Sequence, residues 1–152
     1  MKARAYVDGS FNPALGRYAF GLLCLHGDGA EEEYCGSGDS ADALAQRNVS
    51  GEMIAAMLAV KWALINGYDE LEILYDYVGI EAWVTGAWKA KNDLTRKYAD
   101  AMRKWQERVK LTFTKVAAHT GDEKNERADR LAKQGLEQPV GLPQILPRKT
   151  TV

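Results

Sequence analysis

Apolar residues recur along this chain with two different periods, and the order in which those periods alternate limits the possible folds more than any other feature. Strand-like patterns occupy residues 3–8, 17–26, 31–37, 71–75 and 109–117. Helical patterns occupy residues 50–66, 77–85, 94–108 and 123–135. Three strands therefore come first, and helices and strands alternate afterwards.

This order predicts an α/β protein built on one mixed five-stranded sheet. Three successive strands joined by short turns form an antiparallel meander, whereas helical connections join parallel strands. Helices are expected on both faces of such a sheet. The first strand is expected to end at Asp8, with Gly9 and Ser10 turning the chain, and Ser50 is expected to cap the first long helix.

The length and charge of the chain limit its organisation. A chain of 152 residues can bury one core. We predict one domain at residues 1–138 and a flexible, proline-containing tail at residues 139–152. The formal net charge of −1 gives no global sign of nucleic-acid binding. Residues 89–115 hold nine Lys or Arg against three Asp or Glu. That excess of six could contact phosphates, or it could be a solvated helix face.

Cysteine usage and hydropathy bear on the compartment. Cys24 and Cys35 flank an expected hairpin, but two cysteines make no disulfide framework, so we expect free thiols. The N-terminus lacks an apolar core of signal-peptide length. The segment at residues 18–25 is nearly apolar but too short to span a bilayer. A cytoplasmic protein without a membrane partner is expected.

Four carboxylates stand where regular structure is expected to begin, end or turn. Asp8 and Asp76 end expected strands, Glu52 opens the first long helix, and Asp129 lies inside the last helix. Acids gathered at strand ends are costly unless a cation neutralises them, and Mg²⁺ is the usual cation for a site of oxygen ligands. Such a cluster is typical of two-metal phosphodiester chemistry.

Four motifs, taken in order, resemble those of the type 1 ribonuclease H family. They are the strand-ending Asp8-Gly9-Ser10, Asn48 four residues before Glu52, Asp76 after the fourth strand, and His119-x-Gly121-x-x-x-Asn125-Glu126-x-x-Asp129. The resemblance covers nearly all of residues 1–135 and implies the ribonuclease H-like fold. It also implies an endoribonuclease that hydrolyses the RNA strand of RNA/DNA hybrids and leaves 5′-phosphate and 3′-hydroxyl ends.

The resemblance implies a role for each carboxylate. Asp8 would bridge two Mg²⁺ ions, with Mn²⁺ as a substitute, and Glu52, Asp76 and Asp129 would complete the metal site. Two such ions, about 4 Å apart, activate the attacking water and stabilise the leaving oxygen. His119 would assist proton transfer or product release. A loop histidine can also be purely structural, and the other histidine, His26, is expected at the surface.

The resemblance also implies substrate contacts. A hybrid-specific enzyme must sense the 2′-hydroxyl groups of RNA, which a shallow minor groove exposes. The implied substrate-binding residues are Gly9, Ser10, Asn48, Trp83, Trp88, Lys89 and Asn125. Asn48 could equally be a turn former, and Trp83 could be a core residue. Trp62, Trp105, Met53 and Met57 are expected to pack rather than bind.

Other functions remain open at the level of sequence. A different nuclease or a transposase of the same superfamily would share the acids without the context of Asn48 and His119. A non-catalytic hybrid-binding module would keep the fold without needing the acids. A plain globular domain with surface acids would need four independent coincidences. The leading hypothesis is an active, metal-dependent enzyme that acts as a monomer on RNA/DNA hybrids.

Overall fold

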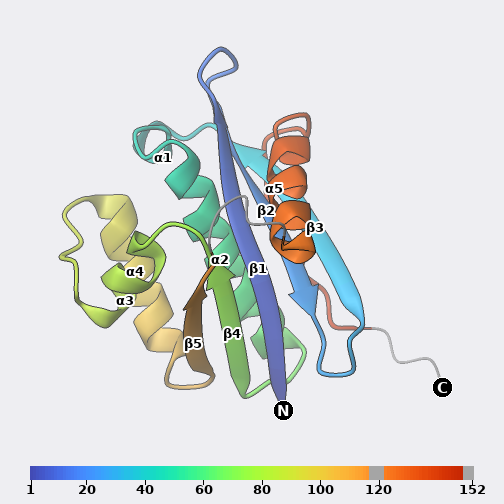
Figure 1. Ribbon diagram of the computed structural model, residues 1–152. Coiled ribbons are helices and arrows are strands. Elements are labelled where there is room, and N and C mark those ends of the chain that lie inside the picture. Colours follow the sequence, from blue (N-terminus) through green and yellow to red (C-terminus); the bar gives the residue numbers. More distant parts are fainter. Residues whose placement is uncertain (117–121, 149–152) are drawn as a thin grey trace.

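The computed structural model describes residues 1–116 and 122–148 (Figure 1). Its strands are β1 (Lys2–Asn12), β2 (Arg17–Leu25), β3 (Glu31–Gly38), β4 (Glu70–Tyr75) and β5 (Lys110–Lys115). Its helices are α1 (Ala41–Leu44), α2 (Asn48–Ile65), α3 (Gly79–Thr85), α4 (Asp93–Trp105) and α5 (Glu123–Gly135). The predicted order of strands and long helices is confirmed, and α1 is an additional short helix.

The five strands form one mixed sheet in the order β3-β2-β1-β4-β5. β1, β2 and β3 pair antiparallel, whereas β4 pairs in parallel with both β1 and β5. The acidic strand β3 therefore lies at an edge, where charged side chains discourage pairing with another chain. The predicted α/β fold with a mixed five-stranded sheet is confirmed.

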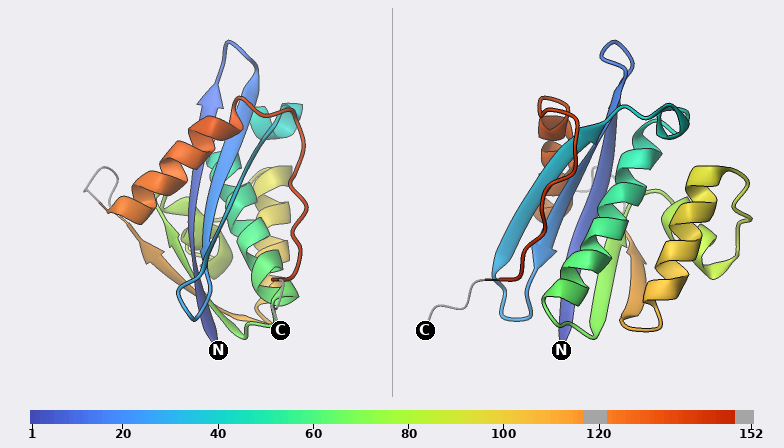
Figure 2. Two further views of the ribbon diagram at one scale, coloured as in Figure 1. Left: turned by 90° about the vertical axis from the view of Figure 1, so that its right-hand side faces the viewer. Right: turned by 180° about the vertical axis from the view of Figure 1, so that it is seen from behind.

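Helices cover both faces of the sheet (Figure 2). The larger core lies on the face that packs against α2, and its largest fully buried side chain is that of Trp62. The smaller core lies beneath α5 and includes Tyr6, Leu74 and Leu131. Successive side chains of a strand point to opposite faces, so Val7 enters the first core and Tyr6 the second. Both helical layers thus bury an apolar face.

The first strand is longer than predicted. β1 does not end at Asp8 but stays paired with β2 as far as Asn12, and the chain turns over residues 13–16. The prediction that Gly9 and Ser10 form a turn is therefore wrong. A side chain at Gly9 would overlap the backbone of α2, so this glycine permits a close helix approach rather than a bend.

The start of α2 also differs from the prediction. The helix begins at Asn48, and its N-cap, Arg47, adopts a positive φ of 55° without a side-chain capping bond. Ser50 lies inside the helix, fully buried, and its hydroxyl donates to the carbonyl of Ala43. Ser50 therefore ties α2 to the short helix α1 rather than capping α2, and the capping prediction is wrong.

Within the described part of the chain, one helix meets the length and composition expected of a membrane span. It is α2, whose 18 residues have a mean hydropathy of 1.3, and 61% of them are buried within the fold. The core helix of a globular domain meets the same criterion, because it packs against apolar side chains instead of lipid. The buried face of α2 here packs against β1 and β2.

The described tail residues follow the outside of the domain. Residue 141 forms an isolated bridge with Ser37 in β3, and Ile145 packs against the larger core. The backbone N–H of Arg148 donates to the side chain of Asn66, while its guanidinium pairs with Asp28 at 2.8 Å. The predicted flexibility of residues 139–152 stays a prediction, and residues 149–152 lie outside the described part.

Two predictions about individual side chains have different outcomes. Cys24 and Cys35 are free, as predicted, and pack on opposite faces of the sheet. His26 is not a surface residue: it is only 5% exposed. Its Nδ1 and Nε2 lie 2.6 Å from the Tyr68 hydroxyl and 2.5 Å from Glu32. Burial is possible because both ring nitrogens have hydrogen-bonding partners.

Candidate active site

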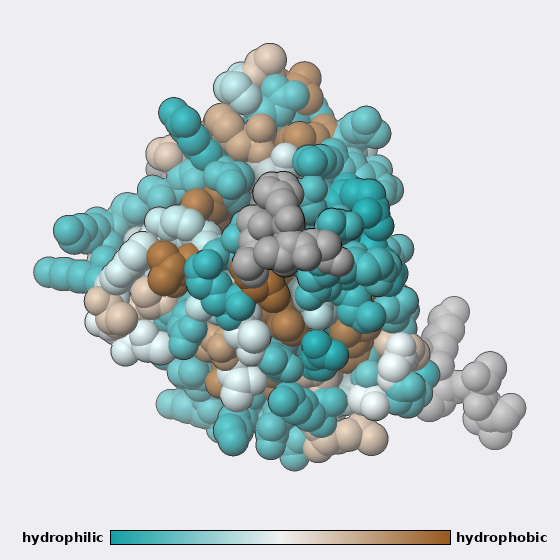
Figure 3. All heavy atoms as spheres, in the orientation of Figure 1, coloured by the Kyte–Doolittle hydropathy of each residue, from teal (hydrophilic) through white to brown (hydrophobic). Residues whose placement is uncertain are grey.

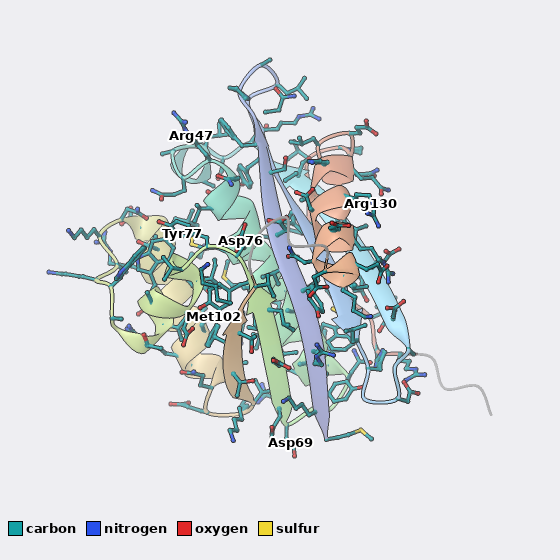
Figure 4. All side chains as sticks on the ribbon, in the orientation of Figure 1. Arg47, Asp69, Asp76, Tyr77, Met102 and Arg130 are labelled. Atoms are coloured by element: carbon teal, nitrogen blue, oxygen red, sulfur yellow. The ribbon has the colours of Figure 1, made fainter. Side chains whose placement is uncertain are left out.

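Three of the four predicted carboxylates line one pocket. This carboxylate pocket has a volume of about 300 Å³ and is lined by Asp8, Asn48, Val49, Glu52, Asp76, Tyr77, Val78 and Lys115. Figure 4 shows Asp76 and Tyr77 where β4 ends and the chain turns toward α3, with Asp69 at the opposite end of that strand. The pocket thus brings together β1, α2, the end of β4 and the end of β5.

Glu52 reaches the pocket from the first turns of α2 and is held by the backbone beyond β4. It is only 3% exposed. Its carboxylate accepts hydrogen bonds from the N–H groups of Asp76 at 3.0 Å and Tyr77 at 2.9 Å. The pairing of β1 with β4 ends at Leu74, so the backbone N–H groups of Asp76 and Tyr77 have no partner in β1. The carboxylate of Glu52 accepts their hydrogen bonds instead. Glu52 therefore both belongs to the pocket and fixes the chain at Asp76.

Asp8 lies within β1 on the face that α5 covers. Its carboxylate accepts a hydrogen bond from the N–H of Gly9 at 2.8 Å. Burial raises the pKa of Asp8 to about 7, and the nearby carboxylates of Asp129 and Asp76 add to the rise. Asp129 thus lies close enough for its charge to raise the pKa of Asp8, although Asp129 does not line the pocket. Its own Oδ2 pairs with Lys133, one helical turn along α5, at 3.0 Å.

Glycines set the positions of the two helices that carry Glu52 and Asp129. A Cβ at Gly51 in α2 would overlap the carbonyl of Ala19 in β2, and a Cβ at Gly21 in β2 would overlap the backbone of α5. Neither glycine has a positive φ, so close packing is the reason for their presence. These contacts let both helices lie against the sheet and place their acids near Asp8.

The predicted 2′-hydroxyl readers lie beside these acids. Asn48 is exposed at the start of α2 and lines the carboxylate pocket. Gly9 and Ser10 follow Asp8 in β1 and are partly exposed. Asn48 therefore shares a pocket with Asp8 and Glu52, whereas Gly9 and Ser10 continue the strand from Asp8 and are not among its lining residues. Asn48 is a helix residue rather than a turn former, and its contact with substrate stays a prediction.

The predicted tryptophans form an aromatic cluster next to the pocket. Trp83 is 8% exposed and packs against Tyr77, Trp88 and Tyr98, with ring centroids 5.9–6.5 Å apart. Its surroundings are those of a core residue. Trp88 is 39% exposed and, with Lys89, lines a separate pocket between α4 and the segment that joins it to α3. The surface in Figure 3 is largely hydrophilic over α5 and β3 and more mixed over α3 and α4.

Two predicted residues belong to the segment around α5. His119 lies outside the described residues, so its role stays a prediction. Asn125 is buried in the first turn of α5, where its backbone N–H donates to the capping side chain of Asp122. This cap fixes the start of the helix that carries Asp129. Asn125 does not line the carboxylate pocket.

Lys115 is a pocket residue that the sequence prediction did not include. In β5, Leu111 and Phe113 pack against the larger core, and the next residue on that face is Lys115. A lysine at the end of an otherwise apolar alternation was the available signal. That signal is weak, because a charged residue at a strand end is common.

The donor set of the site fits a divalent cation. Within residues 1–116 and 122–148, no three acidic, cysteine or histidine side chains are close enough to hold a metal ion in their present positions. Three carboxylates nevertheless share one pocket. Burial raises the pKa of Glu52 to about 8, and the charges of Asp8 and Asp76 contribute. Among the described lining residues, the three carboxylates share the pocket with a single cation, the ammonium group of Lys115, and hard oxygen donors suit Mg²⁺ or Mn²⁺.

The raised pKa values predict that the metal-free protein loses stability as the pH rises. Burial raises the pKa of Asp8 from 3.8 to about 7 and the pKa of Glu52 from 4.5 to about 8. A raised folded-state pKa contributes stability that is complete below the unfolded pKa and is lost as the pH rises through the folded value. Thermal unfolding in EDTA should therefore show a falling Tm between about pH 5 and 8.

Two comparisons test the source of that trend. The variant Glu52→Gln should show a flatter profile over the same range, because it lacks one of the titrating groups. The variant Glu126→Gln, at an exposed helix position, should follow the parent profile. A Tm that stays constant or rises toward pH 8 in the parent protein would contradict the predicted titration.

The fold and the site together define a class of protein. A mixed sheet of this order, with helices on both faces and acids around its central strands, is that of the ribonuclease H-like proteins. The RNase H family profile matches residues 2–137. The chain belongs to the RNase H family, and it is an enzyme of the ribonuclease H type.

Individual relatives agree with this assignment. The chain is 34% identical over 144 residues to a ribonuclease H of Phenylobacterium zucineum, covering 86% of this chain and 88% of the relative. It is similar to the crystal structure of an RNase H1 from Halobacterium salinarum, with a TM-score of 0.75 and 28% identity over 90% of this chain and 98% of the other.

A third comparison concerns a complex. LC11-RNase H1, solved in complex with an RNA/DNA hybrid, matches with a TM-score of 0.70, covering 89% of this chain and 96% of the other. The two chains are 22% identical, so this likeness shows the fold alone.

The two acids in the middle of α5 should differ in their importance. Glu126 is exposed, whereas Asp129 lies close enough to Asp8 for its charge to raise the pKa of Asp8. We expect Glu126→Ala to change hybrid cleavage by less than about threefold, as for a surface substitution of about 0.5 kcal/mol. Asp129→Asn should lower the rate far more. Equal losses in steady-state kcat for the two variants would mean that Asp129 is misassigned.

Proposed function

We propose that this protein hydrolyses the RNA strand of RNA/DNA hybrids at the carboxylate pocket, leaving 5′-phosphate and 3′-hydroxyl ends. The observation that carries the proposal is that Asp8 in β1, Glu52 in α2 and Asp76 just after β4 line one pocket in a chain whose residues 2–137 match the RNase H profile. The hybrid complex of the structural neighbour LC11-RNase H1 supports the choice of substrate.

The four carboxylates are proposed as the ligands of two divalent ions, which RNase H enzymes generally use. Asp8, Glu52 and Asp76 would bind from the pocket and Asp129 from α5. When bound, the ions supply activation of the attacking water and stabilisation of the leaving oxygen. The proposal is supported by the raised pKa values of Asp8 and Glu52, because a cation would offset the repulsion among these acids.

The protein's own side chains have three tasks in this proposal. Glu52 holds the backbone of Asp76 and Tyr77, so the acids stay in position while substrate enters. Asn48, which lines the pocket, and Gly9 and Ser10, which follow Asp8 in β1, are proposed to contact the 2′-hydroxyls of the RNA strand. His119 is proposed to move a proton beside the leaving group.

The DNA strand is proposed to lie over the aromatic cluster. Trp88 is the exposed member of that cluster, and Lys89 is its basic neighbour. Sugars pack on aromatic rings, and lysine contacts phosphates without reading sequence. Trp83 would act by supporting Trp88 from within the core. A cytoplasmic monomer without a membrane partner completes the proposal.

The test is the cleavage of a labelled RNA/DNA hybrid in Mg²⁺ and in Mn²⁺, beside matched double-stranded RNA, double-stranded DNA and single-stranded RNA. We expect cleavage of the RNA strand of the hybrid alone, with 5′-phosphate ends by gel mobility and phosphatase sensitivity. Asp76→Asn serves as the control for contaminating nucleases.

Other outcomes would support other functions. Cleavage of duplex DNA at a similar rate would indicate a different nuclease of the superfamily. Hybrid binding without cleavage in either metal ion would indicate a non-catalytic binding module. Neither result would change the family assignment, which rests on the sequence profile and the fold.

A further inference from the structure

Lys115 occupies an unusual place in the fold. The residues before it on the same face of β5, Leu111 and Phe113, pack against the larger core. At Lys115 this apolar row ends, and the lysine is exposed at the wall of the carboxylate pocket. β5 pairs with β4 through Tyr75 and Lys115, so the lysine lies beside the residue that precedes Asp76.

Charge sets Lys115 apart from the other residues of the pocket. Of the described residues that line it, three are carboxylates and Lys115 is the single cation. Among the ion pairs of residues 1–116 and 122–148, with nitrogen and oxygen within 4.0 Å, Lys115 takes no part, whereas Lys133 is paired with Asp129 at 3.0 Å. Lys115 therefore faces the pocket without a close carboxylate partner in the described part of the chain.

An anionic substrate needs a positive contact at such a pocket. A phosphodiester that approaches three carboxylates is repelled, and a lysine ammonium at the same opening offsets part of that repulsion. Lysine binds phosphate as a flexible point charge that donates hydrogen bonds. Two basic side chains of α4 are already engaged within the protein, because Arg96 pairs with Asp93 and Arg103 donates to the carbonyls of Trp83 and Val84.

We propose that Lys115 contacts the backbone phosphate of the nucleic acid that enters the carboxylate pocket, through a hydrogen bond from its ammonium group to a non-bridging oxygen. This inference rests on the proposed function, since it assigns a phosphate contact to the same site. Lys115 is a residue that touches substrate in this assignment. It is not a metal ligand, because an ammonium group carries no free lone pair.

The experiment measures hybrid binding and cleavage separately for Lys115→Met and Lys115→Arg. Fluorescence anisotropy in EDTA over a range of salt gives affinity without cleavage. Lys115→Met should weaken binding about tenfold and reduce the slope of log K against log salt by roughly 1, as for one lost phosphate contact. Lys115→Arg should restore most of both values because it retains the charge.

A matched control and a second readout make the result specific. Lys110→Met removes an exposed lysine from the other end of the same strand, and it should leave the affinity and salt slope unchanged. Calorimetric titration of the substrate-free protein with Mg²⁺ measures whether Lys115 acts on the carboxylates. Tighter Mg²⁺ binding in Lys115→Met with unchanged hybrid affinity and slope would overturn the phosphate contact.

Failure of this inference can be distinguished from failure of the proposed function. If the parent protein cleaves no hybrid, the proposed function is wrong whatever Lys115 does. If the parent cleaves hybrid and Lys115→Met matches it in affinity, salt slope and kcat/KM, only the assignment of Lys115 is wrong. Loss of cleavage in Lys115→Met with the predicted change of salt slope supports both the proposed function and the phosphate contact of Lys115.

Discussion

Replacing Asp76 by Asn should abolish hybrid cleavage while leaving the protein folded. The two side chains have nearly the same shape. The substitution also keeps the backbone N–H at position 76, which donates a hydrogen bond to the carboxylate of Glu52. The variant replaces one negatively charged carboxylate of the pocket, a proposed metal ligand, by a neutral amide. We expect a fall in kcat on the order of a thousandfold, the scale seen when one electrostatic contact to a transition state is removed. Single-turnover cleavage in Mg²⁺ measures it.

The same substitution should not destabilise the metal-free protein. The charge of Asp76 contributes to the raised pKa of both Asp8 and Glu52, so its removal relieves repulsion. Thermal unfolding in EDTA at pH 8 should give a Tm equal to that of the parent or about 1–3 °C higher, which corresponds to less than about 1 kcal/mol. Unimpaired cleavage would refute the site, and a large fall in Tm would attribute lost activity to misfolding.

Replacing Gly51 by Ala should lower the free energy of unfolding more than any of the other substitutions proposed for this protein. The added methyl group would overlap the carbonyl oxygen of Ala19. It would also lie only 3.0 Å from the Cα of Gly9. Backbone atoms cannot rotate away as a side chain can, so α2 would have to move off the sheet. We expect a loss of about 3 kcal/mol or more, the upper range for overpacking, and a Tm lower by roughly 10 °C.

The matched control is Gly27→Ala, another glycine without a positive φ. Its added methyl group would come no closer than 3.3 Å to the backbone of Lys2 near the N-terminus. That variant should unfold within about 2 °C of the parent protein. Equal stability of Gly51→Ala and the parent, measured by thermal and urea unfolding, would show that α2 does not need this close approach.

A stable but displaced α2 would also be informative for function. Glu52 follows Gly51 directly, so a shift of the helix moves the carboxylate that holds the backbone of Asp76 and Tyr77. Any Gly51→Ala protein that remains folded should therefore cleave poorly. Residual activity should fall in step with the loss of Mg²⁺ affinity measured by calorimetry.

The sequence by itself determined the order of strands and long helices, and it singled out Asp8, Glu52 and Asp76, which the fold brings into one pocket. The elements could be predicted because the periods of apolar residues follow from whether a segment is a helix or a strand. α5 matches its predicted bounds, and Asp76 follows β4 directly, as predicted. These features depend on local pattern, and local pattern is visible in one sequence.

Only the tertiary structure decided what several small or polar residues do. Gly9 resembles a turn residue in sequence but lies in a continuous strand beneath α2, and His26 resembles a surface residue but is buried between Tyr68 and Glu32. Lys115 faces the acids because β5 pairs with β4 in one particular register. Each outcome depends on contacts between segments far apart in the chain, and such contacts leave no periodic trace in the local sequence.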